Sequence, residues 1–255
     1  MFGLVKRYRT ACLLALAAWT VGGAARAADV TVLCSAGLKS VVEQLAPEFE
    51  ARTGDHLVVT YDTSVLLKAQ VEAGRPFDVV VLTPPLIGAL IQQGKVADGS
   101  AVPLARTGIG LAVKAGAPRP DIASVDALRR TLTGAGSVVY STTGVSGSLF
   151  SAALQTLGIA DAVKARARTI ANGFTGDVVA RGEADLAVQL MPELMSVPGV
   201  DVVGPFPAEL QAYVVLTAGL SAAAAADKAG AEAFLSFLKA PSAAAVIRAK
   251  GLEPI

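Results

Sequence analysis

The stretch that decides the fold is YDTSVLLKAQVEAGRPFDVVVLT, residues 61–83. Its central part, residues 64–74, carries apolar residues at helical spacing and ends at a glycine, which indicates a helix. The run at 77–83 is almost continuously apolar, as is typical of a strand buried on both faces of a parallel sheet. Because HLVVTY at 56–61 is strand-like as well, this stretch predicts a βαβ unit and an α/β fold.

The same alternation of strand and helix extends outward in both directions. Within the alanine-rich stretch at 222–232, Asp227, Lys228 and Glu232 are spaced as on the outer face of a helix. No internal repeat and no long linker divides the chain, so two lobes would require it to cross between them more than once. The other expected elements are strands at 29–35, 108–116, 136–141, 184–190 and 212–220 and helices at 38–54, 124–132, 146–158 and 231–251.

The first 27 residues have the features of a cleaved signal peptide. Lys6, Arg7 and Arg9 precede an apolar run at 11–21, and Ala-Arg-Ala at 25–27 has the small-x-small form of a signal-peptidase site. The apolar run is too short for a good membrane span. We therefore expect export to the periplasm, with an uncleaved anchor as the alternative.

Composition excludes several classes of function. Removal of residues 1–27 takes away four basic residues and no acidic one, which leaves 18 basic against 21 acidic residues and a formal charge of about −3. That balance gives no basic field for nucleic acid. Cys34 and His56 are then the only cysteine and histidine, so neither an intrachain disulfide nor a metal site rich in these residues is expected, and no cofactor is implied. At the end of a buried strand, Cys34 is expected to be a small hydrophobe.

Four predicted strand-to-helix junctions are rich in hydrogen-bond donors: residues 35–37, 62–64, 142–147 and 172–173. In open α/β sheets, ligands bind outside the carboxyl ends of the strands. Helix N-termini there offer unpaired N–H groups and partial positive charge. These residue types are also ordinary helix caps and turn formers, so the functional interpretation depends on their recurrence at successive strand ends. The sequence thus predicts a site for a small anion.

Several segments resemble the type 2 periplasmic solute-binding proteins of ABC importers, and among them the molybdate-binding branch. The resemblance covers residues from about 29 to 255. The segments that carry it are LAPEFEARTG at 45–54, the stretch at 61–83, RGEADLAV at 181–188, and AEAFLSFLKAPSAAAVIRAKGLEP at 231–254.

The resemblance implies two α/β lobes, each a mixed sheet flanked by helices, with a ligand cleft between them. Lobe 1 would comprise residues 28–105 with 211–255 returning to it, and lobe 2 residues 106–210. A monomer would capture a molybdate- or tungstate-like oxyanion and deliver it to a membrane permease. Sulfate, phosphate or a small organic carboxylate are alternative ligands on the same fold.

Positions of the family's ligand contacts in lobe 1 carry over in part. The first-loop serine falls on Gly37, with Ser35 close by. The second-loop serine pair falls on Thr63 and Ser64, which is the best match. Lys39 and Lys68 are available as charges, although both suit solvated helix positions.

In lobe 2, the backbone donors fall on Ser146, beside Gly147, and near Asn172. The family's tyrosine falls on Leu190 or on the neighbouring Gln189, so no phenol is expected there. The loss of a tyrosine donor and a serine donor would remove two hydrogen bonds to a desolvated ion, each worth roughly 1.5 to 3 kcal/mol.

Two other classes of function compete with a binding protein. GVSGS at 144–148 lacks the second glycine of a nucleophile elbow, and His56, expected at a surface or sheet edge, has no matched nucleophile and orienting acid. Glu183 and Asp185 suit a turn and a strand start, so no enzyme activity is expected. A secreted scaffold would not need donor-rich loops at four strand ends.

Overall fold

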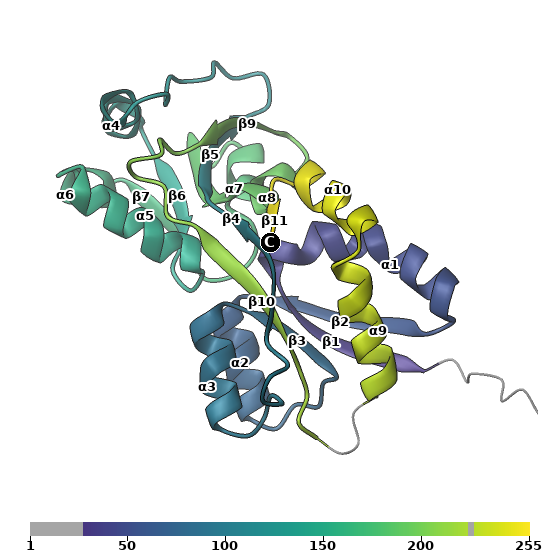
Figure 1. The fold of residues 1–255 in the computed structure, drawn as a ribbon. Coiled ribbons are helices and arrows are strands. Elements are labelled where there is room, and N and C mark those ends of the chain that lie inside the picture. The colour runs from purple at the N-terminus through teal and green to yellow at the C-terminus, as the bar shows by residue number, and fades with distance from the viewer. Residues whose placement is uncertain (1–27, 224–226) are drawn as a thin grey trace, which may run out of the picture.

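The computed structural model describes residues 28–223 and 227–255, so the predicted signal peptide lies outside the described residues. These residues form two mixed sheets flanked by helices (Figure 1). One sheet has the strand order β11-β4-β10-β3-β1-β2, and the other β7-β6-β8-β5-β9. The predicted α/β class with a mixed sheet in each lobe is confirmed.

The first sheet belongs to the lobe that holds both ends of the described chain, lobe 1. Strand β1 pairs in parallel with β2 and β3, and β10 pairs antiparallel with β3 and β4. Helix α1 ends where Gly54 takes a left-handed conformation, with φ of 81°. The strands are β1 (Asp29–Ser35), β2 (His56–Asp62), β3 (Val79–Leu82), β4 (Val102–Thr107), β10 (Val214–Leu220) and β11 (Glu253–Pro254), and the helices are η1 (Ala36–Leu38), α1 (Lys39–Thr53), α2 (Ser64–Glu72), α3 (Pro84–Gln92), α9 (Lys228–Leu238) and α10 (Pro241–Ala249).

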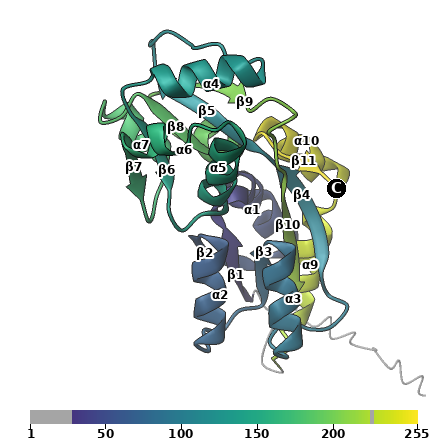
Figure 2. The same cartoon turned by 90° about the vertical axis from the view of Figure 1, so that its left-hand side faces the viewer.

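The second sheet belongs to lobe 2, the upper part of Figure 2, where helix α4 lies at the top and α2 and α3 of lobe 1 lie at the bottom. Strand β6 pairs in parallel with β7 and β8, whereas β5 pairs antiparallel with β8 and β9. The strands are β5 (Ile109–Lys114), β6 (Val138–Ser141), β7 (Ala167–Ile170), β8 (Leu186–Leu190) and β9 (Val200–Pro205), and the helices are α4 (Val125–Gly134), α5 (Val145–Thr156), α6 (Ala160–Lys164), α7 (Thr175–Ala180) and α8 (Met191–Met195).

The predicted lobe limits stay a prediction, but the sheets allow a closer description. Strand β4 continues through Thr107, two residues beyond the predicted end of the first part of lobe 1. Asp227 does not lie on the outer face of a helix: it is the N-cap of α9, and its side chain accepts a hydrogen bond from Gly230 N–H. His56 lies on β2, the edge strand, and its side chain is 64% exposed, as expected.

The chain passes between the sheets at two neighbouring segments, β4 to β5 and β9 to β10. The side chain of Gln211 joins these two segments. Gln211 Oε1 accepts a hydrogen bond from Ile109 N–H at 2.9 Å, and Gln211 Nε2 donates to the Ile109 carbonyl oxygen at 2.9 Å. At the start of α8, Met191 N–H donates to the Gly108 carbonyl oxygen at 3.0 Å. These bonds tie the second crossing and α8 to the first crossing.

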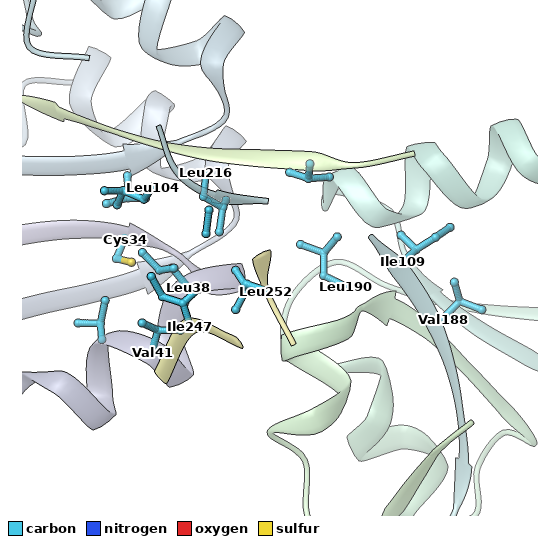
Figure 3. Close-up of a cluster of buried hydrophobic side chains, with 14 of the residues drawn as sticks. Cys34, Leu38, Val41, Leu104, Ile109, Val188, Leu190, Leu216, Ile247 and Leu252 are labelled. Atoms are coloured by element: carbon cyan, nitrogen blue, oxygen red, sulfur yellow. The ribbon is translucent and has the colours of Figure 1, made fainter. Parts of the chain in front are cut away.

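One hydrophobic cluster extends through both lobes. Figure 3 shows Leu252 between the lobe 1 residues Leu38 and Ile247 on one side and Leu190 of lobe 2 on the other. Cys34, in the same cluster, is fully buried, and burial raises the pKa of its thiol, which fits the expected role of a small hydrophobe. The apolar core is therefore continuous across the junction between the lobes.

Among the described residues, no single helix has the length and apolar composition needed to cross a membrane. Helices α9 and α10 meet this test only as a pair, and they are bent by 64° at their junction.

Candidate functional site

A cavity of about 550 Å³ lies between the two lobes, at the carboxyl ends of β1, β2, β6 and β7. All four predicted donor-rich loops contribute to its lining. Two of them meet because β1 and β2 are parallel neighbours, with Ser35 opposite Asp62. The predicted ligand contacts that line the cavity are Ser35, Thr63, Ser64, Ser146, Asn172 and Gln189.

The lobe 1 wall carries buried hydroxyl groups at a helix N-terminus. Ser64 Oγ donates a hydrogen bond to Ser35 Oγ at 3.0 Å, and both residues are buried. Thr63 caps α2, since its Oγ1 accepts the N–H of Leu66 at 3.3 Å. The N–H groups of Ser64 and Val65 in the first turn have no intrahelical acceptor and can bind an anion.

Lys39 is the only lysine or arginine in the part of the cavity lining that the structure describes. Its Nζ lies 5.7 Å from the ring centroid of Tyr61 in lobe 1 and 5.6 Å from that of Phe174 in lobe 2. Its ion pair with Glu43 is long, at 3.7 Å. Lys39 therefore lies between aromatic rings from both lobes, with its charge available to a ligand.

Tyr61 also lines the cavity and was missed as a candidate residue. Burial first, and then the neighbouring Cys34 and Glu43, raise the pKa of Tyr61, so its phenol stays protonated at neutral pH. The sequence signal was its place at the end of a strand, directly before the Asp-Thr-Ser loop. Lobe 1 thus supplies a phenol, although the position that matches the family's tyrosine has none.

The lobe 2 wall is built on the N-terminus of α5. Gly144 N–H donates to Ser141 Oγ at 2.9 Å, and Gly147 N–H donates to the Gly144 carbonyl oxygen at 3.2 Å. A Cβ atom at Gly147 would lie 1.7 Å from the Ser141 carbonyl oxygen, so this glycine permits α5 to pack on β6. Gly147 is therefore a packing residue outside the cavity lining, whereas Ser146 lines the cavity.

The side-chain amide of Gln189 lines the cavity, but its hydrogen bonds go to the protein. Its Oε1 accepts from Thr175 N–H at 2.7 Å and from Thr175 Oγ1 at 3.0 Å. Its Nε2 donates to the Gly173 carbonyl oxygen at 3.3 Å. Gln189 therefore fixes the 173–175 segment, and this segment presents Asn172 and Phe174 to the cavity.

Gly37 and Leu190, at which the resemblance predicts departures from the molybdate-binding pattern, contact each other. A Cβ atom at Gly37 would lie 3.1 Å from Leu190 Cδ1 and 3.5 Å from Leu216 Cδ1. Gly37 is buried outside the cavity lining, whereas Leu190 is 3% exposed and lines it. The missing side chain at Gly37 makes room for Leu190, so the first loop closes on an apolar surface at this point.

Glu193 on α8 is a second residue that sequence reasoning missed. It lines the cavity and is 8% exposed, and its Oε2 accepts the N–H of Leu190 at 3.2 Å. Burial raises the pKa of the Glu193 carboxyl to about 7, opposed by that hydrogen bond. The available signal was an acid three residues after Leu190, the position from which Glu bonds the N-cap N–H.

A metal centre has no support in the residues that the structure describes. No group of three or more His, Cys, Asp or Glu side chains among residues 28–223 and 227–255 is placed to hold a metal ion.

Comparison with known proteins agrees with this architecture. Aconitate isomerase of Pseudomonas sp. is 34% identical over 231 residues, which cover 89% of this chain and 88% of that protein. The periplasmic molybdate-binding protein of Azotobacter vinelandii has a TM-score of 0.72 and 25% identity, over 88% of this chain and 98% of that one.

A third relative shows the fold alone. PEB3 of Campylobacter jejuni, in its L-phospholactate-bound form, has a TM-score of 0.67 and 14% identity, over 88% of this chain and 99% of that one.

The family of bacterial extracellular solute-binding proteins matches residues 30–253, nearly all of the described chain. This chain belongs to the bacterial extracellular solute-binding protein family.

Proposed function

We propose that this protein is exported to the periplasm and captures a small organic polycarboxylate between its lobes. The observation that carries this proposal is the cavity itself. Its volume of about 550 Å³ falls in the range of small-molecule sites. A tetrahedral oxyanion would fill only a small part of it.

The lining of the cavity supports a ligand with a carbon skeleton. Apolar side chains from both lobes lie among the hydroxyl groups, and one of them, Leu190, is one of the two neighbouring positions, with Gln189, on which the oxyanion-contacting tyrosine of the molybdate-binding proteins is expected to fall. An oxyanion has no apolar part to match them, whereas a carboxylic acid does. The larger apolar lining residues are Val65, Leu86, Val145, Phe174 and Leu190.

The donors are distributed around the cavity instead of converging on one point. The N-terminus of α2 with Ser64 and Lys39 lies in lobe 1, and the N-terminus of α5 with Ser146 lies in lobe 2. Carboxylates at the two ends of one molecule can each meet a helix N-terminus. The relative named aconitate isomerase acts on an unsaturated tricarboxylate, which favours this class of ligand over molybdate or tungstate.

As in the binding proteins that this chain resembles, closure of the lobes on the ligand would create the surface that a permease of an ABC importer recognises. Closure also removes the ligand from water, which strengthens each of its hydrogen bonds.

Titration calorimetry with tricarballylate, trans-aconitate and molybdate tests the proposal. We expect saturable binding of a tricarboxylate, and a loss of at least about tenfold in affinity for Lys39→Gln, because one charged hydrogen bond contributes about 1.5 to 3 kcal/mol. Lys164→Gln is the matched control, since Lys164 is exposed on α6 and does not line the cavity. Binding of molybdate with no response to either tricarboxylate would refute it.

A further inference from the structure

Two acidic side chains line the cavity, one from each lobe. Asp62 of lobe 1 is held in place, since its Oδ1 accepts Thr63 N–H at 2.7 Å and its Oδ2 lies 3.5 Å from Gln70 Nε2. Glu193 of lobe 2 has only the bond from Leu190 N–H to its Oε2. No described backbone or side-chain group donates a hydrogen bond to Glu193 Oε1, so this oxygen is available to a ligand.

The surroundings of Glu193 favour exchange of a proton near neutral pH. No lysine or arginine among the described residues lies within 4.0 Å of its carboxyl group, so it has no ion pair. The elements that pack on α8 carry Lys114 on β5, Asp177 on α7 and Asp201 on β9. None of these charges shifts its pKa, which burial and the Leu190 N–H alone set.

We propose that Glu193 is the acid–base group of the cleft and moves a proton between two carbon atoms of a bound unsaturated polycarboxylate, an inference that rests on the proposed function. The Glu193 carboxylate takes a proton from a methylene carbon that lies between a carboxylate and the double bond. The electron pair left on that carbon shifts along the three-carbon unit, so the double bond moves by one position.

The proton then returns from the Glu193 carboxylic acid to the far carbon of the same unit. One C–H bond breaks and another forms, Glu193 regains its starting state, and no oxidant or second reactant is consumed. The product is the same acid with its double bond moved, in the same or the opposite geometry. Lys39 and the N-termini of α2 and α5 are placed to stabilise the negative charge that develops on the substrate carboxylates.

The geometry meets the requirements for such a group. A general base works best when its pKa lies near the working pH, which for a glutamate requires burial of the kind seen here. Glu193 also lies on α8, which contacts η1 of lobe 1, so it is placed next to the junction between the lobes. An ordinary surface glutamate has neither property.

Proton exchange in D₂O tests the inference with the full mature protein. Trans-aconitate is incubated with the protein, and ¹H NMR follows loss of the methylene signal and appearance of the cis isomer. We expect isomerisation, with or without deuterium exchange, to be at least about 100-fold faster in the wild type than in Glu193→Gln, whose amide oxygen still accepts the Leu190 N–H. The wild-type rate should rise with pH and level off above about 7. Glu209→Gln, at an exposed position outside the cavity lining, should match the wild type.

Calorimetry with tricarballylate on the same variants separates the two proposals. Tricarballylate binding with neither isomerisation nor deuterium exchange of trans-aconitate in the wild type would overturn the role of Glu193 and leave the binding function standing. Equal isomerisation rates in wild type and Glu193→Gln, or loss of the pH dependence only in Asp62→Asn, would overturn it as well. Absence of tricarboxylate binding would overturn both proposals.

Discussion

On the lobe 1 wall of the cleft, Ser35 and Ser64 bond to each other and Lys39 is free for a ligand. On the lobe 2 wall, Gln189 bonds to Thr175 and Gly173, and Ser141 bonds to Gly144. The polar side chains named on the second wall thus fix its own loops, whereas the first wall also offers the charge of Lys39 and the first-turn N–H groups of α2 to a ligand. The lobe 1 wall therefore supplies most of the binding groups, while the lobe 2 wall supplies a fixed shape and one buried acid, Glu193.

The largest effect is expected where the lobe 2 wall is most tightly packed. Gly147→Ala would place Cβ 1.7 Å from the Ser141 carbonyl oxygen, which is backbone and cannot turn away. We expect a loss of more than about 4 kcal/mol in the free energy of unfolding, or no folded protein. Urea denaturation measures it. A matched control is Gly88→Ala in α3, where a Cβ meets nothing within 4 Å and we expect a gain of roughly 0.5 to 1 kcal/mol. Similar changes in the free energy of unfolding at both glycines would show that the close contact of Gly147 with Ser141 does not determine stability.

Glu193 makes the stability of the lobe 2 wall depend on pH. Its pKa is about 7 in the folded protein against an ordinary value of 4.5, so the folded state binds the proton more tightly and stability falls as pH rises through this interval. Glu193→Gln, which has no proton to lose, should exceed the wild type at pH 8 by up to about 3 kcal/mol and equal it near pH 4. Thermal melts of both proteins across this range provide the measurement, and parallel pH profiles would contradict the prediction.

Gly37 of lobe 1 and Leu190 of lobe 2 lie in contact, so substitutions at these two positions should have coupled effects on the free energy of unfolding. Gly37→Ala brings Cβ to 3.1 Å from Leu190 Cδ1, and we expect a cost of about 1 to 2 kcal/mol. In a Leu190→Ala background the same change should cost less, with a coupling energy of about 1 kcal/mol in a double-mutant cycle. Additive effects would show that the two departures from the family pattern are independent.

The smallest effect is expected for two threonines of the lobe 1 wall that precede helices, whose substitution should change the free energy of unfolding by different amounts. Thr63 Oγ1 accepts the N–H of Leu66, whereas Thr83, the N-cap of α3, makes no side-chain capping bond. Thr63→Ala should lower the free energy of unfolding by about 1 kcal/mol, and Thr83→Ala should change it by only a few tenths. Chemical denaturation of the two variants side by side gives the answer. The reverse order would mean that Thr63 is kept for ligand binding and not for capping.

Much of the architecture was predictable because it follows from periodicity. The apolar runs at 77–83 and 184–190 fall on strands of the two sheets, and all four donor-rich loops line the cavity. Strand β4 and helix α3 were not identified, since VPLART alternates poorly and PPLIGALIQ begins with two prolines.

Details of the site depend on contacts between residues distant in the sequence, which periodicity does not contain. Nothing in the local sequence shows that Gly37 packs on Leu190, that Thr175 donates two hydrogen bonds to Gln189 Oε1, or that Glu193 is buried with no ion pair among the described residues. Tyr61 was overlooked because a tyrosine at a strand end is more often part of the core. Gln211 joins the two crossing segments through Ile109, a contact between residues distant in the sequence that the local pattern does not contain.

The polycarboxylate-binding proposal is tested most directly by a thermal melt of residues 28–255 with tricarballylate and with molybdate, each at millimolar or higher concentration. A ligand present at about 100 times its dissociation constant stabilises the folded state by about 2.7 kcal/mol, which raises the melting temperature of a domain of this size by several degrees. Our account predicts this rise with tricarballylate and none with molybdate. A rise with molybdate alone would contradict it and would favour oxyanion binding, as in the molybdate-binding protein of Azotobacter vinelandii.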